Sequence, residues 1–79
     1  MLARHYSKEK KYPEAAALYE NAMRRLEKTS GPNSPDLAGL LEEYAMVEKT
    51  LQNYAEAEQA RVRSLGIRVK QALRAESPK

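Results

Sequence analysis

Residues 12–23 read YPEAAALYENAM, and residues 54–65 read the related stretch YAEAEQARVRSL, 42 positions further along the chain. The same displacement brings together four identical pairs: Ala3 with Ala45, Tyr12 with Tyr54, Glu14 with Glu56, and Ala15 with Ala57. An internal period of about 20 to 50 residues is typical of solenoid proteins, in which each unit buries its apolar face against a neighbouring unit. The chain is therefore predicted to contain two copies of one structural repeat.

Helix signals divide the first copy into two helices. The first is predicted from residue 2 to about residue 10, and Pro13 suits the first turn of the next helix. The second extends to about Thr29. Its apolar residues follow the i, i+3, i+4, i+7 spacing of one buried stripe: Ala15, Leu18, Tyr19, Ala22, Met23 and Leu26.

The second copy begins after a loop at residues 30–33, where glycine and proline end a helix. Ser34 is a predicted N-cap, with Pro35 in the first turn. A third helix is predicted over residues 35–51, with these apolar residues on its inward side: Leu37, Leu40, Leu41, Tyr44, Ala45 and Leu51.

A fourth helix is predicted from Tyr54 to about Ala75, restarted after a tight turn by a capping box of Asn53 and Glu56. Apolar residues on it also recur at helical spacing: Val62, Leu65, Val69, Ala72 and Leu73. We therefore predict an all-α fold of antiparallel helix-turn-helix repeats, a short α-solenoid.

Composition excludes several classes of function. The 79 residues include no cysteine and one histidine, so no thiolate site exists, and we expect no metal and no cofactor. No apolar run approaches the roughly 20 residues that cross a bilayer, so we expect no membrane partner and a cytoplasmic location. The chain is expected to begin inside a helix, which leaves open an upstream segment removed by processing.

Charge alternates along the chain. Residues 1–29 carry seven Lys or Arg and four Asp or Glu, residues 30–60 carry one and six, and residues 61–79 carry six and one. Such alternation fits a solenoid with differently charged faces better than a uniformly basic nucleic-acid binder, so a nucleic-acid partner is disfavoured.

Several of these residues resemble the tetratricopeptide repeat (TPR) signature. The first copy carries Leu2-Ala3-x-x-Tyr6 and Tyr12-x-Glu14-Ala15, followed by Tyr19 and Ala22; the second keeps Tyr44-Ala45, Tyr54-x-Glu56-Ala57 and Leu65. The 42-residue period and the linker Gly-Pro-Asn-Ser-Pro-Asp at residues 31–36 are similar to the kinesin-light-chain subtype. The resemblance covers residues 2 to about 70 and implies TPR-type helical repeats.

The chain also departs from the family pattern. Glu48 stands where a large apolar residue is usual, and Arg61 and Ser64 stand at an aromatic and an alanine position. These polar residues predict that the fourth helix has solvent on a side where another repeat would sit. The first helix begins later than the family pattern requires, so we expect it to be truncated.

This organisation divides the chain into four segments. Residues 1–29 form a first TPR-like unit with a truncated first helix, and residues 30–36 form a linker. Residues 37–76 form a second unit with a long terminal helix, and residues 77–79 form a tail.

The resemblance implies a binding groove, because in this family the first helix of each pair lines a concave surface on which partners lie. Carried over by position, the groove residues are Arg4, Ser7, Lys8, Gly39, Glu42, Met46 and Lys49. The kinesin-light-chain subtype often has two Asn residues that bind the peptide backbone, where this chain has Glu42 and Glu43. Carboxylates accept hydrogen bonds but do not donate them, so we expect a basic ligand. The alternative is a solvated stripe that binds nothing.

The last predicted helix has a basic side formed by Arg63, Lys70 and Arg74, with Arg61 and Arg68 nearby. An acidic partner, a phosphate-rich surface or RNA would suit it. Because no aromatic residue lies within residues 55–79 to stack a base, we favour a solvated convex face.

Two functions follow from the sequence. The leading hypothesis is a non-enzymatic scaffold that binds a peptide or protein partner along the groove. The alternative is a self-association unit that forms a homodimer or larger homo-oligomer through exposed repeat faces.

Overall fold

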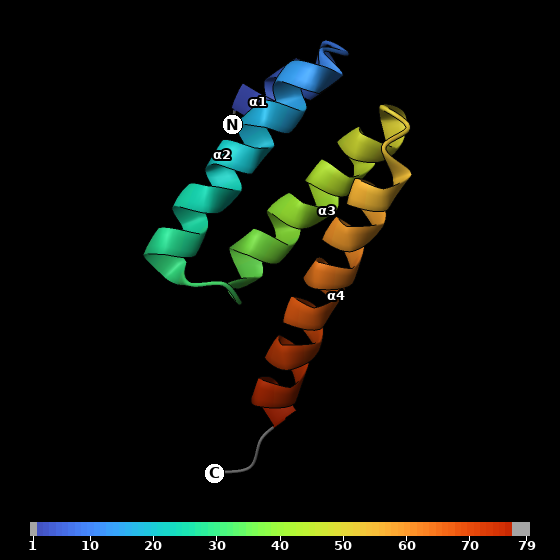
Figure 1. Cartoon of the computed structure of the whole chain (residues 1–79). Coiled ribbons are helices and arrows are strands. Elements are labelled where there is room, and N and C mark those ends of the chain that lie inside the picture. The colour runs from blue at the N-terminus through green and yellow to red at the C-terminus, as the bar shows by residue number, and fades with distance from the viewer. Residues whose placement is uncertain (1, 77–79) are drawn as a thin grey trace.

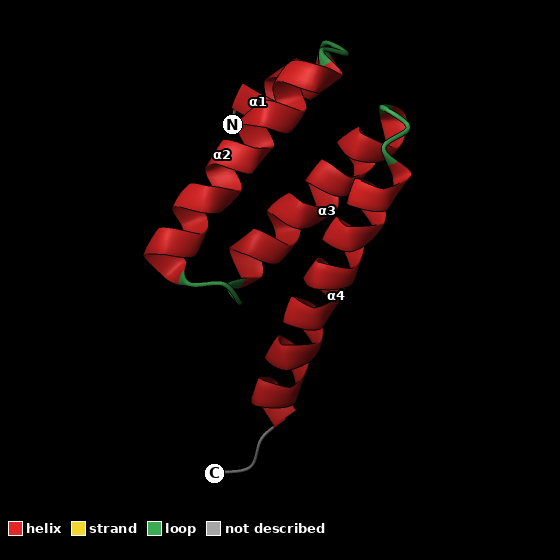
Figure 2. Cartoon of the chain, in the orientation of Figure 1, coloured by secondary structure: helices red, strands yellow, loops and turns green. Residues whose placement is uncertain are grey.

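The computed structural model describes residues 2–76, which form four α-helices and no strand. The helices are α1 (Leu2–Lys8), α2 (Tyr12–Ser30), α3 (Pro35–Thr50) and α4 (Tyr54–Glu76). Figure 1 shows two antiparallel hairpins, α1 with α2 and α3 with α4, and Figure 2 shows how short the connections between helices are. The predicted all-α fold is confirmed, and each helix end lies within two residues of its predicted place. The predicted tail at residues 77–79 lies outside the described residues.

The two hairpin turns have the same geometry, 42 residues apart. Lys10 and Gln52 each adopt a left-handed conformation, with φ of 64° and 66°. Each turn closes with matching backbone hydrogen bonds, Lys11 N to Tyr6 O and Asn53 N to Glu48 O, both 2.8 Å long. This six-to-one bond beside a left-handed residue is the Schellman way of ending a helix. The sequence period is therefore also a period of the backbone.

The connection between the hairpins follows the predicted signals. Gly31 takes φ of 87°, which a residue without Cβ adopts at little cost. The side chain of Ser34 accepts a hydrogen bond of 3.1 Å from Leu37 N, so the predicted N-cap of α3 is confirmed. The capping box predicted for α4 does not form among the described residues; instead, Asn53 Nδ2 donates to Glu48 Oε2 at 3.0 Å.

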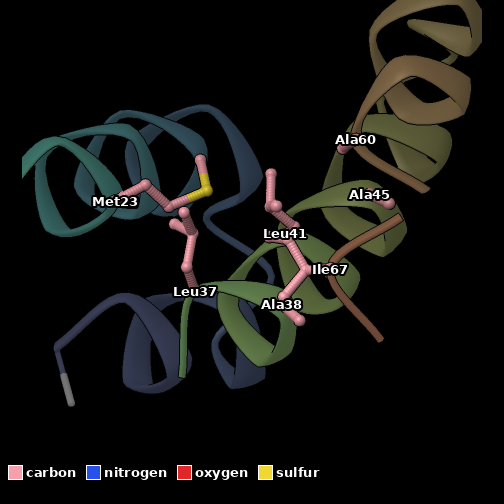
Figure 3. Close-up of a cluster of buried hydrophobic side chains, with 7 residues drawn as sticks. All are labelled: Met23, Leu37, Ala38, Leu41, Ala45, Ala60 and Ile67. Carbon is pink, nitrogen blue, oxygen red and sulfur yellow. The ribbon is translucent and has the colours of Figure 1, made fainter. Parts of the chain in front are cut away.

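Two buried clusters hold the helices together. The first joins α2, α3 and α4 through Met23, Leu37, Ala38, Leu41, Ala45, Ala60 and Ile67, and Figure 3 shows Met23 facing Leu37. The second joins α1, α2 and α3 through Ala3, Ala15, Ala16, Tyr19 and Val47. Small residues at the contacts let helices approach closely, which explains why alanine recurs at equivalent positions.

The polar residues that depart from the family pattern differ in their exposure to solvent. Glu48 is only 5% exposed, and its side chain accepts the bond from Asn53 that braces the turn. Ser64 is 4% exposed, and its hydroxyl donates to Arg61 O at 3.0 Å. Arg61 itself is exposed. Solvent therefore meets α4 at Arg61, as predicted, whereas Ser64 packs against the rest of the chain.

Helix α4 buries a different face from the one that carries the predicted apolar series. The residues buried on it are Ala57, Ala60, Ser64 and Ile67, and α4 packs mainly on α3. The predicted helical series of Val62, Leu65, Val69 and Leu73 lies on the other side, each residue between 51% and 64% exposed. Helical periodicity thus identified the helix correctly but not the face that packs, because α4 is apolar on two sides.

Candidate functional site

Two hollows adjoin on the surface and share the side chain of Met46. The smaller, of about 350 Å³, lies among α1, α2 and α3, and the larger, of about 730 Å³, lies between α3 and α4. Met46 is 72% exposed and borders both. Both hollows lie toward the ends of the helices at which the two hairpin turns are found.

Six of the seven groove residues named from the sequence border these hollows. Arg4, Ser7 and Lys8 line the smaller hollow. Glu42 and Lys49 line the larger one, and Met46 joins the two sets. Gly39 borders neither hollow, because it lies in the part of α3 nearer the inter-hairpin loop.

Glu43 is the electrostatic centre of the smaller hollow. Arg4 donates to it from Nε at 2.6 Å and from Nη2 at 2.8 Å, and the Tyr19 hydroxyl donates at 3.1 Å. The hydrogen bond from Arg4 holds the pKa of the Glu43 carboxyl below its usual range, and Tyr19 adds to the effect. Burial, followed by the bond to Glu43, raises the pKa of Tyr19 to about 12. The site therefore keeps a carboxylate and a neutral phenol at neutral pH.

Glu42 is held in a second ion pair, on the side of the larger hollow. Arg68 donates to it from Nε at 3.0 Å and from Nη2 at 3.2 Å. This contact holds the pKa of the Glu42 carboxyl below its usual range. The expectation of a basic ligand rested on these two carboxylates. Both are already paired with arginines of the same chain.

Sequence reasoning missed several residues that border the hollows. The smaller hollow is also lined by Tyr12, Tyr19, Val47 and Thr50, and by Glu43, which the family resemblance already indicates beside Glu42. The larger is also lined by Ala45, Tyr54, Ala57, Glu58, Arg61, Val62, Ser64 and Leu65. Tyr12 and Tyr54 occupy equivalent positions in the two copies, and each begins the second helix of its hairpin. This equivalence could have indicated these two residues.

The predicted basic side of α4 makes contacts with neighbouring elements. Arg63 Nη1 pairs with Glu27 Oε1 of α2 at 3.2 Å, and Lys70 Nζ donates to Asn33 Oδ1 of the loop at 3.4 Å. Part of this side therefore fastens α4 to the first hairpin.

Residues 2–76 contain no group of three or more side chains arranged to hold a metal ion. None of the helices in that range combines the length and the apolar character that crossing a membrane requires.

Comparison with known families agrees with the geometry of the repeats. The family model described as tetratricopeptide repeat matches residues 1–74. No curated protein and no solved structure matches the chain. Tetratricopeptide repeats generally mediate protein–protein interaction and are typically non-catalytic. The match spans nearly the whole sequence, and we conclude that the chain belongs to the tetratricopeptide repeat family.

Proposed function

We propose that the chain is a non-enzymatic scaffold that holds an extended segment of a partner protein along the groove formed by its two hollows. The observation that supports this most directly is the convergence of six groove residues, from α1 and α3, on two hollows that meet at Met46. A surface that is concave, mixed in polarity and continuous across two repeats is suited to a peptide.

The smaller hollow offers donors that a peptide backbone could use. Ser7 and Lys8 line it without taking part in the Arg4–Glu43–Tyr19 cluster, whereas the Thr50 hydroxyl already donates to Met46 O at 2.9 Å. The preference for a basic ligand stays a prediction, and its basis is weaker than the sequence indicated. A lysine or arginine of the ligand would have to compete with Arg4 and Arg68 for carboxylates that are already paired.

A catalytic role is not part of this proposal. A general base works best when its pKa lies near the operating pH. The pKa values of Glu42 and Glu43 are both lowered, which takes them further from neutral pH. Their contacts suit them to hold helices together.

The kinesin-light-chain-like subtype is also part of the proposal. Its support is the 42-residue period, which recurs in the two left-handed turn residues. Self-association is a second candidate function, and the exposure of Leu2 and of the apolar residues on α4 favours it.

The groove can be tested with extended peptides selected from a random displayed library on the intact chain. Calorimetric titration of the selected peptides should give dissociation constants in the micromolar range or weaker, because two repeats offer little surface. The double variant Ser7→Ala with Met46→Ala, which removes a donor and an apolar contact without changing the charge of the groove, should weaken binding by about tenfold or more, which corresponds to about 1.4 kcal/mol. Ala17→Glu, exposed on α2, is the control and should bind like the original chain.

Matched basic and acidic peptides of the same length test the ligand charge. We expect the basic set to bind more tightly. Equal affinity of the groove variant and the Ala17→Glu control for every selected peptide would rule out the groove as the binding surface.

A further inference from the structure

Four large apolar side chains on α4 lie on the surface: Val62, Leu65, Val69 and Leu73. Their spacing of three, four and four residues places them on one side of the helix, and we call this set the α4 stripe. The opposite side of α4 packs on α3 through Ala57, Ala60, Ser64 and Ile67. A continuous exposed apolar surface on a small protein marks an interaction site.

The first hairpin shows what covers the equivalent surface. Ala16, Tyr19 and Met23 on α2 are buried, and α3 packs over this helix, with Leu37 and Met23 in the same cluster (Figure 3). The residues 42 positions later are Glu58, Arg61 and Leu65, which line the larger hollow. The second hairpin therefore carries the same kind of surface that receives a helix in the first, and no described element fills it.

The residues at equivalent positions specify a different helix from α3. The neutral hydroxyl of Tyr19 donates a hydrogen bond to Glu43 of α3, and the residue equivalent to Tyr19 is the cation Arg61. Glu20, whose carboxylate accepts from the Tyr44 hydroxyl at 3.5 Å, is replaced by Val62, and Glu27 by Val69. In the first hairpin Glu20 meets α3, whereas Glu27 pairs with Arg63 of α4. An incoming helix therefore meets an apolar side chain at two positions that carry carboxylates in the first hairpin, and a full positive charge at a third.

The charged residues of α4 decide which kind of helix fits the α4 stripe. Glu58 lies one turn before Val62, and residues 61–75 beyond it carry five cations and no carboxylate. Arg63 and Arg68 pair with Glu27 and Glu42, whereas Arg61 makes no ion pair with any side chain that the structure describes. A second copy of α4 docked on the stripe would oppose cations to cations, whereas a helix flanked by carboxylates would satisfy them.

We propose that the α4 stripe binds an acidic amphipathic helix of a partner protein. Its apolar side lies on Val62, Leu65, Val69 and Leu73, and a carboxylate of the helix pairs with Arg61. This goes beyond the proposed groove function, because the α4 stripe contains none of the groove residues, although Val62 and Leu65 also border the larger hollow.

The proposal can be tested on the intact chain with three labelled synthetic helices of about three heptads each. The first has leucines along one side and glutamates beside them, and the second has lysines in place of the glutamates. The third has the composition of the first, with the leucines spread around the helix. Fluorescence anisotropy should show the acidic amphipathic helix binding at least about tenfold more tightly than the other two, with an affinity that falls as salt rises.

Variants on the stripe separate docking from folding. Leu65→Ser with Val69→Ser should weaken binding of the acidic helix by about tenfold or more. The variant should still fold, because both side chains are exposed and contribute little to the stability of the chain. Arg61→Gln leaves the apolar stripe intact and should reduce the preference for the acidic helix over the lysine helix. Ala17→Ser is the matched control on an exposed position of α2, and circular dichroism confirms that each variant is folded.

Further measurements distinguish this proposal from its competitors. Lys8→Glu, which alters the groove, should leave binding of the acidic helix unchanged, so that the groove and the stripe can fail separately. Equal binding of the glutamate and lysine helices, or full binding by the double serine variant, would overturn the proposal. So would vesicles of phosphatidylcholine and phosphatidylserine that bind the chain through the stripe and exclude the peptide. The assay is run at protein concentrations at which light scattering gives the monomer mass of 9.0 kDa. If the chain dimerises through the stripe at every usable concentration, a second copy is the occupant and the proposal is wrong.

Discussion

Glu43 joins three helices through one carboxylate. It lies on α3, accepts two hydrogen bonds from Arg4 of α1 and accepts a third from Tyr19 of α2. Arg4 is more exposed than its partner, with side-chain exposures of 56% and 32%. The cluster therefore fixes the position of α1, a helix of only seven residues, more by geometry than by a large free energy.

Stability should depend on pH through Glu43. Its folded-state pKa is lowered, so its contribution is fully present above the unfolded pKa of about 4.3 and is lost as pH falls through the lowered folded value. Glu43→Gln should lower the free energy of unfolding by no more than about 1 kcal/mol at neutral pH. The variant should also lose less stability than the original chain on acidification, as measured by thermal midpoints at about pH 7 and about pH 3.

Glu58→Gln serves as the control for this measurement, because Glu58 is exposed and forms no ion pair with any described side chain. It should keep the original response to acid. If the Glu43 and Glu58 variants respond to acid alike, the Arg4–Glu43–Tyr19 cluster does not contribute to stability.

The turns between helices are the elements that the repeat reproduces most faithfully. Both hairpins end their first helix on a left-handed residue, and neither residue is glycine. A side chain in this conformation costs about 1 to 2 kcal/mol relative to the right-handed one, so each turn carries some backbone strain. The packing of each hairpin stabilises the turn against that strain.

Replacing the left-handed residue by glycine should relieve the strain. Gln52→Gly is expected to stabilise the chain by up to about 1 kcal/mol, because glycine adopts positive φ without a steric penalty. The same substitution at Gln59, exposed within α4, should destabilise the chain by about 1 kcal/mol. Chemical denaturation of both variants measures the two free energies. Destabilisation of both by the same amount would show that the conformation at Gln52 is not strained.

At the scale of the whole molecule, the two hairpins are unequally covered. The first is covered by α3, whereas the second exposes the α4 stripe and Met46. Solenoid units are stabilised by their neighbours, and about three units are usually needed for a stable core. The chain thus has an apolar surface for which no described element of its own provides a partner.

Self-association should follow from this surface at high protein concentration. We expect the mass from light scattering to rise above 9.0 kDa along a concentration series. The rise should be larger at high salt, because salt screens the repulsion between the cations of two α4 helices. The Leu65→Ser with Val69→Ser variant should remain monomeric. A mass that stays near 9.0 kDa at all concentrations, in low and high salt, would contradict this expectation.

The sequence by itself determined the helices, their ends and the repeat. The apolar spacing, the Ser34 cap and Gly31 act locally, so a linear pattern is enough to predict them. Ala15 and Ala57, which the period of 42 residues pairs, are both buried. The groove residues on α1 and α3 were carried over by position from the family resemblance, and they stay a prediction.

Tertiary structure alone decided which face of α4 packs and which ionic groups remain free. Ala60 and Ile67 are buried although the apolar side chains of the α4 stripe also have helical spacing, because α3 contacts only one side of the helix. Likewise, the pairing of Glu42 with Arg68, and of Glu43 with Arg4, joins residues 26 and 39 positions apart. Periodicity reports what one helix could bury, whereas the neighbours that a helix meets depend on how the hairpins pack in space.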